Sequence, residues 1–240
     1  MREHLSQLNR NELLRYRAVH IPQPSNADRV RPDMVMNDIN NFLQDAVRME
    51  ERLHRMARTY CWLMPRYILR GWRMFLLNAN VDLSIDCPTL LERIAAALRL
   101  PEHTVTMSWY VQHGTYYACL LTEEEETRLY EHKVVCITLW SGLPLLAVRL
   151  MGASIEQRFR DALKVALFGD SFNLLDGIHD DLNLAFSAGR RFVDRLSDHL
   201  SREQQHRFVP REAPADKERL PTDDGGWPGG AGGVRGGQGS

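Results

Sequence analysis

Arginine and aromatic side chains alternate along residues 48–73, and no other part of the sequence is better suited to binding. The candidate binding residues are Arg48, Arg52, Arg55, Trp62, Arg66, Tyr67, Arg70, Trp72 and Arg73. Guanidinium groups form paired hydrogen bonds with phosphate or carboxylate oxygens, and aromatic rings stack on nucleic-acid bases. The stretch therefore indicates contact with nucleic acid, or with a protein through a surface built on the aromatic rings.

The same stretch has a plainer interpretation. The arginines could form the solvated face of a helix whose aromatic residues lie in the core, and Asp45, Glu50 and Glu51 could pair with some of them. Charge patterns of this kind are common on the helices of ordinary proteins. The sequence leaves both interpretations open.

A second group of chemically capable side chains comprises Asp176, His179, Asp180 and Asp181. On a helix, the first three would share one face, and carboxylate oxygens with an imidazole nitrogen can hold a divalent metal. The alternative is a turn at Asp176 followed by acids at a helix start. No second set of ligands follows at a recognisable spacing, so we expect neither a metal nor a cofactor.

Cysteine chemistry offers a weaker possibility of catalysis. Cys119 and Cys136 fall on predicted strands, and either thiol could act as a nucleophile beside His113 or His132. Buried cysteines, however, are usually inert small hydrophobic residues. The sequence also lacks dinucleotide-binding, P-loop, serine-hydrolase, zinc-protease and kinase motifs. We therefore expect a protein that is not an enzyme.

The composition is that of an ordinary folded protein. The chain has 240 residues, 44% of them hydrophobic, and a net charge of −1. These values exclude a wholly disordered chain and a strongly basic nucleic-acid coat. Arginine supplies 27 of the 30 basic residues. A GC-rich genome explains this bias most simply, although scarce lysine is also compatible with a viral or effector accessory protein.

Targeting signals are missing from the sequence. The first ten residues are polar, and no run of about eighteen apolar residues occurs. We therefore expect no membrane association and a cytoplasmic or nuclear location.

The first half of the chain shows mainly helical patterns. Residues 1–30 comprise a predicted helix over 5–19 and a proline-containing linker. Apolar residues spaced three and four apart predict one long helix from Asp33 to about Pro65. A further amphipathic stretch extends to residue 76. Residues 88–100 form another predicted helix, with Thr89 and Glu92 at capping-box spacing.

The pattern changes to alternation in the middle of the chain. Strands are expected at 104–111, 115–121, 134–140 and 145–150, and a short helix is expected at about 122–132. This ββαββ unit over residues 104–150 predicts an α+β fold that is mainly helical, with a small antiparallel sheet flanked by helices.

The last part of the ordered chain is again expected to be helical. Helices are predicted at 154–168 and 190–207, with partial helix over 172–187. The globular domain would then span residues 31–209. Residues 210–240 are glycine-rich and are expected to be disordered.

Together these features predict a non-enzymatic interaction or regulatory protein. Its partner would be another protein or a second copy of the chain, bound through the N-terminal helices. The alternative is a nucleic-acid-binding protein that uses residues 48–73. That alternative predicts an affinity that falls steeply with salt, because bound arginines release counterions from the phosphates.

Overall fold

The chain divides into two compact units, residues 1–209 and 210–240. The computed structural model describes residues 1–21, 31–66, 68–77, 86–99, 105–123, 132–150, 153–169 and 172–199. The tail that the sequence predicts to be disordered, 210–240, lies outside the described residues.

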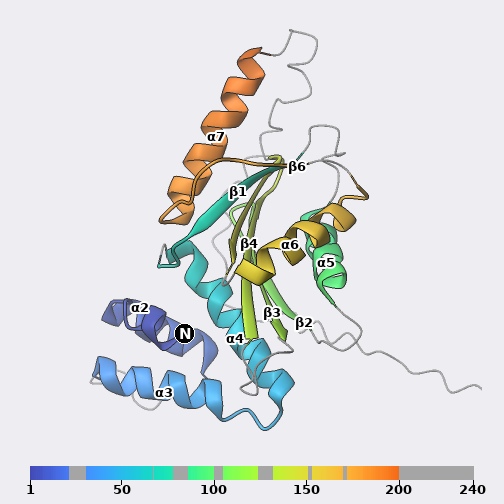
Figure 1. Cartoon of the computed structure of the whole chain (residues 1–240). Helices are drawn as coiled ribbons and strands as arrows, with labels where there is room; N and C mark the ends of the chain where they lie inside the picture. The colour runs from blue at the N-terminus through green and yellow to red at the C-terminus, as the bar shows by residue number, and fades with distance from the viewer. Residues whose placement is uncertain are drawn as a thin grey trace, which may run out of the picture. The chain divides into compact units, whose positions relative to one another are not determined.

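A six-stranded antiparallel sheet forms the centre of the described part of residues 1–209 (Figure 1). Its strands are β1 (Trp72–Leu77), β2 (Val105–Gln112), β3 (Thr115–Glu123), β4 (His132–Trp140), β5 (Leu145–Leu150) and β6 (Phe172–Leu174). Their order across the sheet is β2-β3-β4-β5-β1-β6. Strand β2 therefore lies at one edge, and the short strand β6 lies at the other.

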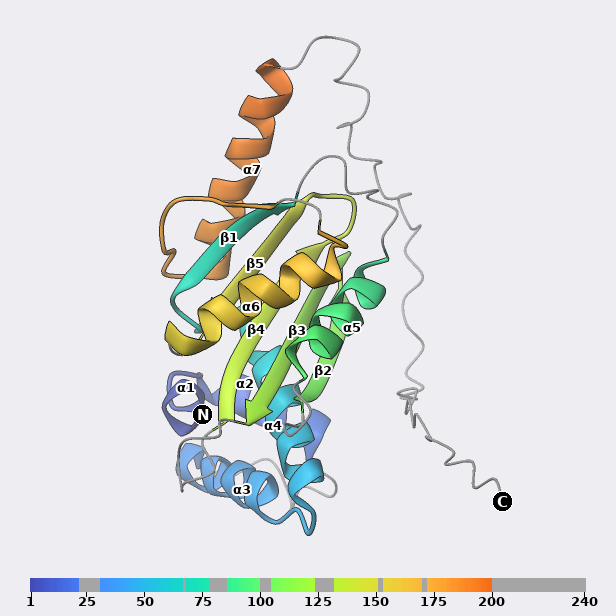
Figure 2. The same ribbon diagram turned by 45° about the vertical axis from the view of Figure 1, so that its right-hand side comes forward.

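Helices cover both faces of this sheet (Figure 2). They are α1 (Arg2–Leu5), α2 (Arg10–His20), α3 (Pro32–Gln44), α4 (Met49–Leu63), α5 (Cys87–Leu98), α6 (Ala153–Ala166) and α7 (Leu182–His199). Helices α4 and α7 pack on one face, which we call face 1, and α1 to α3 join the same hydrophobic core beside α4. Helices α5 and α6 pack on the other, which we call face 2.

The strands separate two hydrophobic cores because successive side chains point to opposite faces. In β4, Cys136 contributes to the core of face 1, and its neighbour Ile137 contributes to the core of face 2. In β1, Met74 and Phe75 divide in the same way. The central strands are therefore apolar at nearly every position, and this explains their weak alternation in the sequence.

The prediction of a small ββαββ sheet is wrong. The structure confirms an α+β fold, but the sheet also includes β1 and β6. The residues of β1 were placed in an amphipathic stretch, and no strand was expected there. Five of its six residues are buried, so its sequence carries neither helical nor strand periodicity. It pairs with β5, which follows more than sixty residues later, a contact that local patterns cannot indicate.

The long helix expected from Asp33 is also interrupted. Helix α3 ends at Gln44 and α4 begins at Met49. Both helices bury apolar residues of the predicted stripe, such as Ile39 and Leu53, but Met49 beside the break is 45% exposed. The guanidinium of Arg55 joins the two helices, because it donates to the carbonyl oxygen of Phe42 and lies 4.3 Å from the centre of that ring.

Two helices expected in the second half of the chain are not found as predicted within the described residues. The short helix expected between β3 and β4 lies almost wholly outside the described residues, although 122 and 123 belong to β3. The partial helix expected over 172–187 is instead strand β6 followed by the start of α7 at Leu182. Among the described helices, none is long and apolar enough to cross a membrane.

Candidate functional site

The structure distributes the nine predicted binding residues over several places. Arg48 and Arg52 are exposed at the start of α4. Arg55 forms an ion pair with Glu51, one turn away on the same helix. This arrangement matches the plainer interpretation of a charged helix face.

Trp62 and Arg66 form a compact pair at the end of α4. The guanidinium carbon of Arg66 lies 3.1 Å from the centre of the Trp62 ring, and its Nη1 donates to the Trp62 carbonyl oxygen. The ring of Trp62 also packs edge-on against Tyr16 of α2, with centres 5.1 Å apart. Trp62 thus packs α2 against α4, and both residues are partly exposed.

The remaining predicted residues lie elsewhere. Trp72 is fully buried in the core of face 1, and Arg73, the next residue, projects toward face 2 and pairs with Glu156 of α6. The side chain of Arg70 is exposed, and Tyr67 lies outside the described residues. The nine residues therefore do not form one continuous surface, and their role in binding stays a prediction.

His20 is enclosed by this aromatic cluster. Its ring lies 4.5 Å from that of Tyr16 and 6.4 Å from that of Trp62. Burial, aided by the charges of Arg58 and Arg66, lowers the pKa of His20 to about 4. The native state therefore keeps this imidazole neutral at pH values where the unfolded chain binds a proton.

This difference predicts that acid weakens the fold through His20. Because the pKa is about 6.5 in the unfolded chain, stability falls as the pH drops below 6.5 and the loss levels off near pH 4. Urea unfolding at pH 7 and pH 5 should show that wild type loses about 2 kcal/mol more between these values than His20→Gln. Equal losses in the two proteins would contradict the prediction.

The other side chains that the sequence offered for chemistry, the acidic cluster at 176–181 and the cysteines, take part in the fold itself. The backbone of His179 pairs with Trp72, and the carboxylate of Asp181 accepts from the N–H of Leu184 at the start of α7. Cys119 and Cys136 are buried cross-strand neighbours, and burial raises the pKa of Cys119 well above its usual value. Within the described residues, no group of His, Cys, Asp or Glu side chains could hold a metal ion.

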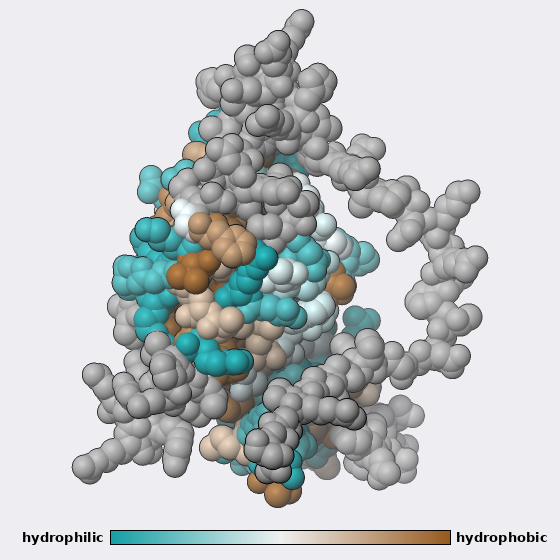
Figure 3. Space-filling model, turned by 90° about the vertical axis from the view of Figure 1, so that its right-hand side faces the viewer, coloured by the Kyte–Doolittle hydropathy of each residue, from teal (hydrophilic) through white to brown (hydrophobic). Residues whose placement is uncertain are grey.

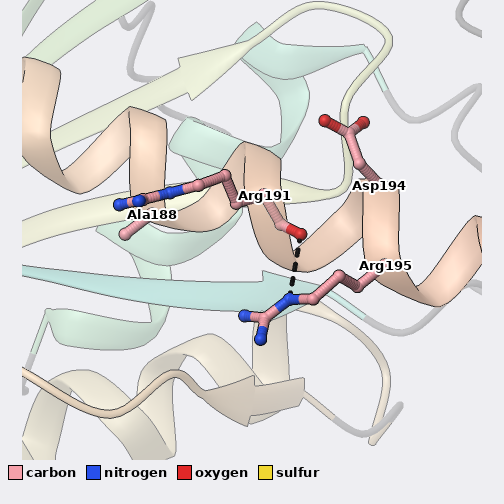
Figure 4. A pocket seen from close by; sticks show the side chains of 4 residues that line it. All are labelled: Ala188, Arg191, Asp194 and Arg195. Atoms are coloured by element: carbon pink, nitrogen blue, oxygen red, sulfur yellow. Dashed lines mark hydrogen bonds between the residues drawn. The ribbon is translucent and has the colours of Figure 1, made fainter.

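A pocket of about 500 Å³ lies against α7. Among the described residues, Ala188, Arg191, Asp194 and Arg195 line it (Figure 4). The Nε of Arg195 donates to the carbonyl oxygen of Arg191, and Asp194 points away from both guanidinium groups. All four residues belong to one helix, so the described chain brings no convergent set of chemical groups to this pocket.

The most distinctive open feature is the outer edge of β2. This eight-residue strand pairs with β3 on one side, and no described strand pairs with it on the other. Unpaired N–H and C=O groups at such an edge can bind a further strand. No residue of β2 is fully buried among the described residues, although α4 packs against one face of the strand.

The register shows which backbone groups are available. His113 and Gly114 both have positive φ angles and form a two-residue turn between Gln112 and Thr115. A turn of this type closes on a hydrogen-bonded pair, and antiparallel ladders alternate from there. The N–H and C=O groups of Thr106, Ser108 and Tyr110 therefore point toward β3. The available residues are Val105, Met107, Trp109 and Val111.

The sequence of β2, VTMSWYVQ, contains no charge and no proline. The side chains of Trp109 and Val111 are 39% and 49% exposed, and both lie on face 2 beside the ring of Tyr116. Natural edge strands usually carry charges, prolines or bulges that prevent pairing with other chains. Strand β2 has no charge and no proline. Its pairing with β3 is continuous from 105 to 112, so it has no bulge there.

The rest of the surface offers weaker candidates. At the opposite edge, β6 has only three residues, and a short edge strand is itself a protection against pairing. On the side that carries α5 and α6, apolar side chains lie among hydrophilic ones (Figure 3). The exposed ring of Phe168 there is covered in part by Arg93, whose guanidinium lies 4.4 Å from the ring centre.

The alternation of polar and apolar residues in β2 correctly predicted a strand, but could not show that the strand lies at an edge. The lack of charge gave no signal of an edge position either, because charges and prolines are what usually mark an edge strand. No family of known proteins matches the chain, and no curated protein is significantly similar to it in sequence. The function is therefore inferred from the geometry of the chain itself.

Proposed function

We propose that this chain is a non-enzymatic interaction protein that binds a protein partner by adding a strand to the outer edge of β2. The observation that carries the proposal is an accessible, uncharged edge strand of eight residues with two exposed hydrophobic side chains. A cytoplasmic or nuclear location remains part of the proposal.

Strand addition fits the chemistry of this edge. Four residues of β2 present both an N–H and a C=O, and main-chain hydrogen bonds of this kind supply affinity for an extended partner segment. Specificity would come from alternate side chains of the partner. Those on face 2 would contact Trp109 and Val111, whose exposed apolar area is removed from water on binding.

Nucleic-acid binding receives less support from the arrangement of the arginines. Arg55, Arg66 and Arg73 each contact a group of the chain itself, and they lie on different parts of it. Arg48, Arg52 and Arg70 remain exposed. A salt series with oligonucleotides tests this alternative, because binding through arginine would weaken steeply as salt rises.

The proposal predicts that one backbone N–H in β2 is needed for peptide binding. A displayed library of extended peptides would be selected on the full chain, and the recovered peptides measured against Val111→Pro. Proline removes the outward N–H of residue 111 and is tolerated on edge strands. We expect affinity to fall about tenfold, which corresponds to about 1.4 kcal/mol.

The matched control is Val111→Thr, which keeps the N–H and a β-branched side chain of similar size. It should bind the recovered peptides like wild type. Circular dichroism would establish that both variants fold. Peptides that bind Val111→Pro as tightly as wild type would overturn the proposal, because their site would then lie away from this edge.

A further inference from the structure

We infer that the strand occupying the β2 edge is β2 of a second copy of the chain, in an antiparallel arrangement centred on Ser108. This inference rests on the proposed function and names its partner. The result is a two-fold symmetric homodimer with one continuous sheet across both copies.

The charge pattern of β2 favours a second copy. In a two-fold symmetric pair of strands, each residue faces the same short sequence, so a charge in β2 would lie near its own symmetry mate. Like charges opposite each other in a sheet are destabilising. Strand β2 has no charged residue, and the net charge of the chain is only −1, so neither local nor overall repulsion opposes pairing.

The available backbone groups select the register. Residues that exchange hydrogen bonds across the new interface must both belong to the outward set 105, 107, 109 and 111. All four find partners when Val105 lies opposite Val111 and Met107 lies opposite Trp109 of the other copy. In this register Ser108 lies opposite Ser108, on the symmetry axis.

The side chains agree with this register. On face 2 it places Val105 against Val111 and Met107 against Trp109, so every pair is apolar. Aromatic and β-branched pairs of this kind are the stabilising unit of sheets. Polar side chains meet on face 1, where the hydroxyl groups of the two Ser108 residues face each other. The exposed parts of Trp109 and Val111 are thereby covered.

The two edges of the sheet explain why assembly would stop at two copies. A symmetric contact uses the same surface on both partners and leaves no second copy of that surface free. Strand β6, at the other edge, has only three residues and offers a poor template. The dimer therefore closes the accessible edge without creating a fibre.

The experiment tests the symmetry axis directly by crosslinking. Ser108→Cys would be made in a Cys61→Ala background, because the Cys61 thiol lies 3.0 Å from the Ser108 carbonyl oxygen and could react with the new thiol. Cross-strand pairs that are not hydrogen-bonded bring Cβ atoms within about 5 Å. Oxidised glutathione, which accepts the two electrons, should therefore join two chains by a disulfide.

Gln112→Cys in the same background is the matched control. In the proposed register, the two copies of residue 112 lie eight positions apart along the strands, or about 26 Å. This variant should remain uncrosslinked, as should the Cys61→Ala protein alone. Light scattering of the wild-type chain at about 50 μM should give the mass of two chains, and Val111→Pro should give the mass of one.

Each outcome has a defined meaning. A monomeric wild type that still binds selected peptides through the β2 edge overturns the homodimer and leaves the proposed function intact. A dimer that is lost in Val111→Pro but is not crosslinked through Ser108→Cys overturns the register. A dimer that persists in Val111→Pro, with peptide binding also unchanged, overturns both the inference and the proposed function.

Discussion

Replacing Trp72 with alanine is expected to lower the free energy of unfolding by about 4 kcal/mol. The side chain is fully buried between β1 and the helices of face 1, and its Nε1 donates to the carbonyl oxygen of Leu69 at 2.7 Å. Removing the indole leaves a large cavity and an acceptor without its donor. Chemical denaturation at neutral pH measures the loss.

Trp72→Phe provides a test if the alanine variant does not fold. Phenylalanine keeps most of the apolar contacts but cannot donate to Leu69, so we expect a smaller loss of about 2 kcal/mol. Arg52→Ala, at an exposed position of the same predicted stretch, should change stability by less than about 0.5 kcal/mol. A small effect of Trp72→Phe and Trp72→Ala alike would show that this residue is not in the core.

Trp72 also shows why the predicted binding stretch does not form one surface. Sequence spacing alone placed Trp72 and Arg73 in one amphipathic stretch with the preceding arginines. They lie instead on β1, where neighbouring side chains point to opposite faces. One of them therefore enters the core of face 1, and the other reaches Glu156 on face 2.

The hairpins in the middle of the chain were predictable because their information is local. The turn at His113 and Gly114 requires positive φ angles, which glycine adopts readily. On each side of it, residues that favour strands make up most of β2 and β3. The turn between β4 and β5, with Gly142 in the same left-handed region, is equally local. Short-range signals of this kind place strands reliably.

The position of each strand within the sheet was not predictable in the same way. β1 joins the sheet beside β5, although α5, β2, β3 and β4 come between them in the chain. This long-range pairing leaves β2 at the edge. The candidate site, the outer edge of β2, exists because of the order of strands in the sheet. The eight residues of β2 alone carry no information about that order.

Gly189, in the middle of α7, is expected to tolerate no large side chain. A Cβ atom there would lie 3.1 Å from Cγ and Cε of Met74 and 3.2 Å from Cδ1 of Leu145, which belong to β1 and β5. The glycine thus allows α7 to approach the sheet closely. Gly189→Leu should lower the free energy of unfolding by about 3 kcal/mol, because overpacking forces the helix or both side chains to move.

The neighbouring Ser187 provides a control that separates the effect of close packing at Gly189 from any effect of adding leucine to α7. It is exposed on the same helix, so Ser187→Leu adds a side chain without meeting the sheet and should change stability by less than about 0.5 kcal/mol. Leucine favours a helix more than glycine by nearly 1 kcal/mol, so propensity alone would make Gly189→Leu stabilising. A loss in denaturant unfolding therefore reports the close packing of α7 on β1 and β5, and a gain would show that the helix does not approach the sheet at this point.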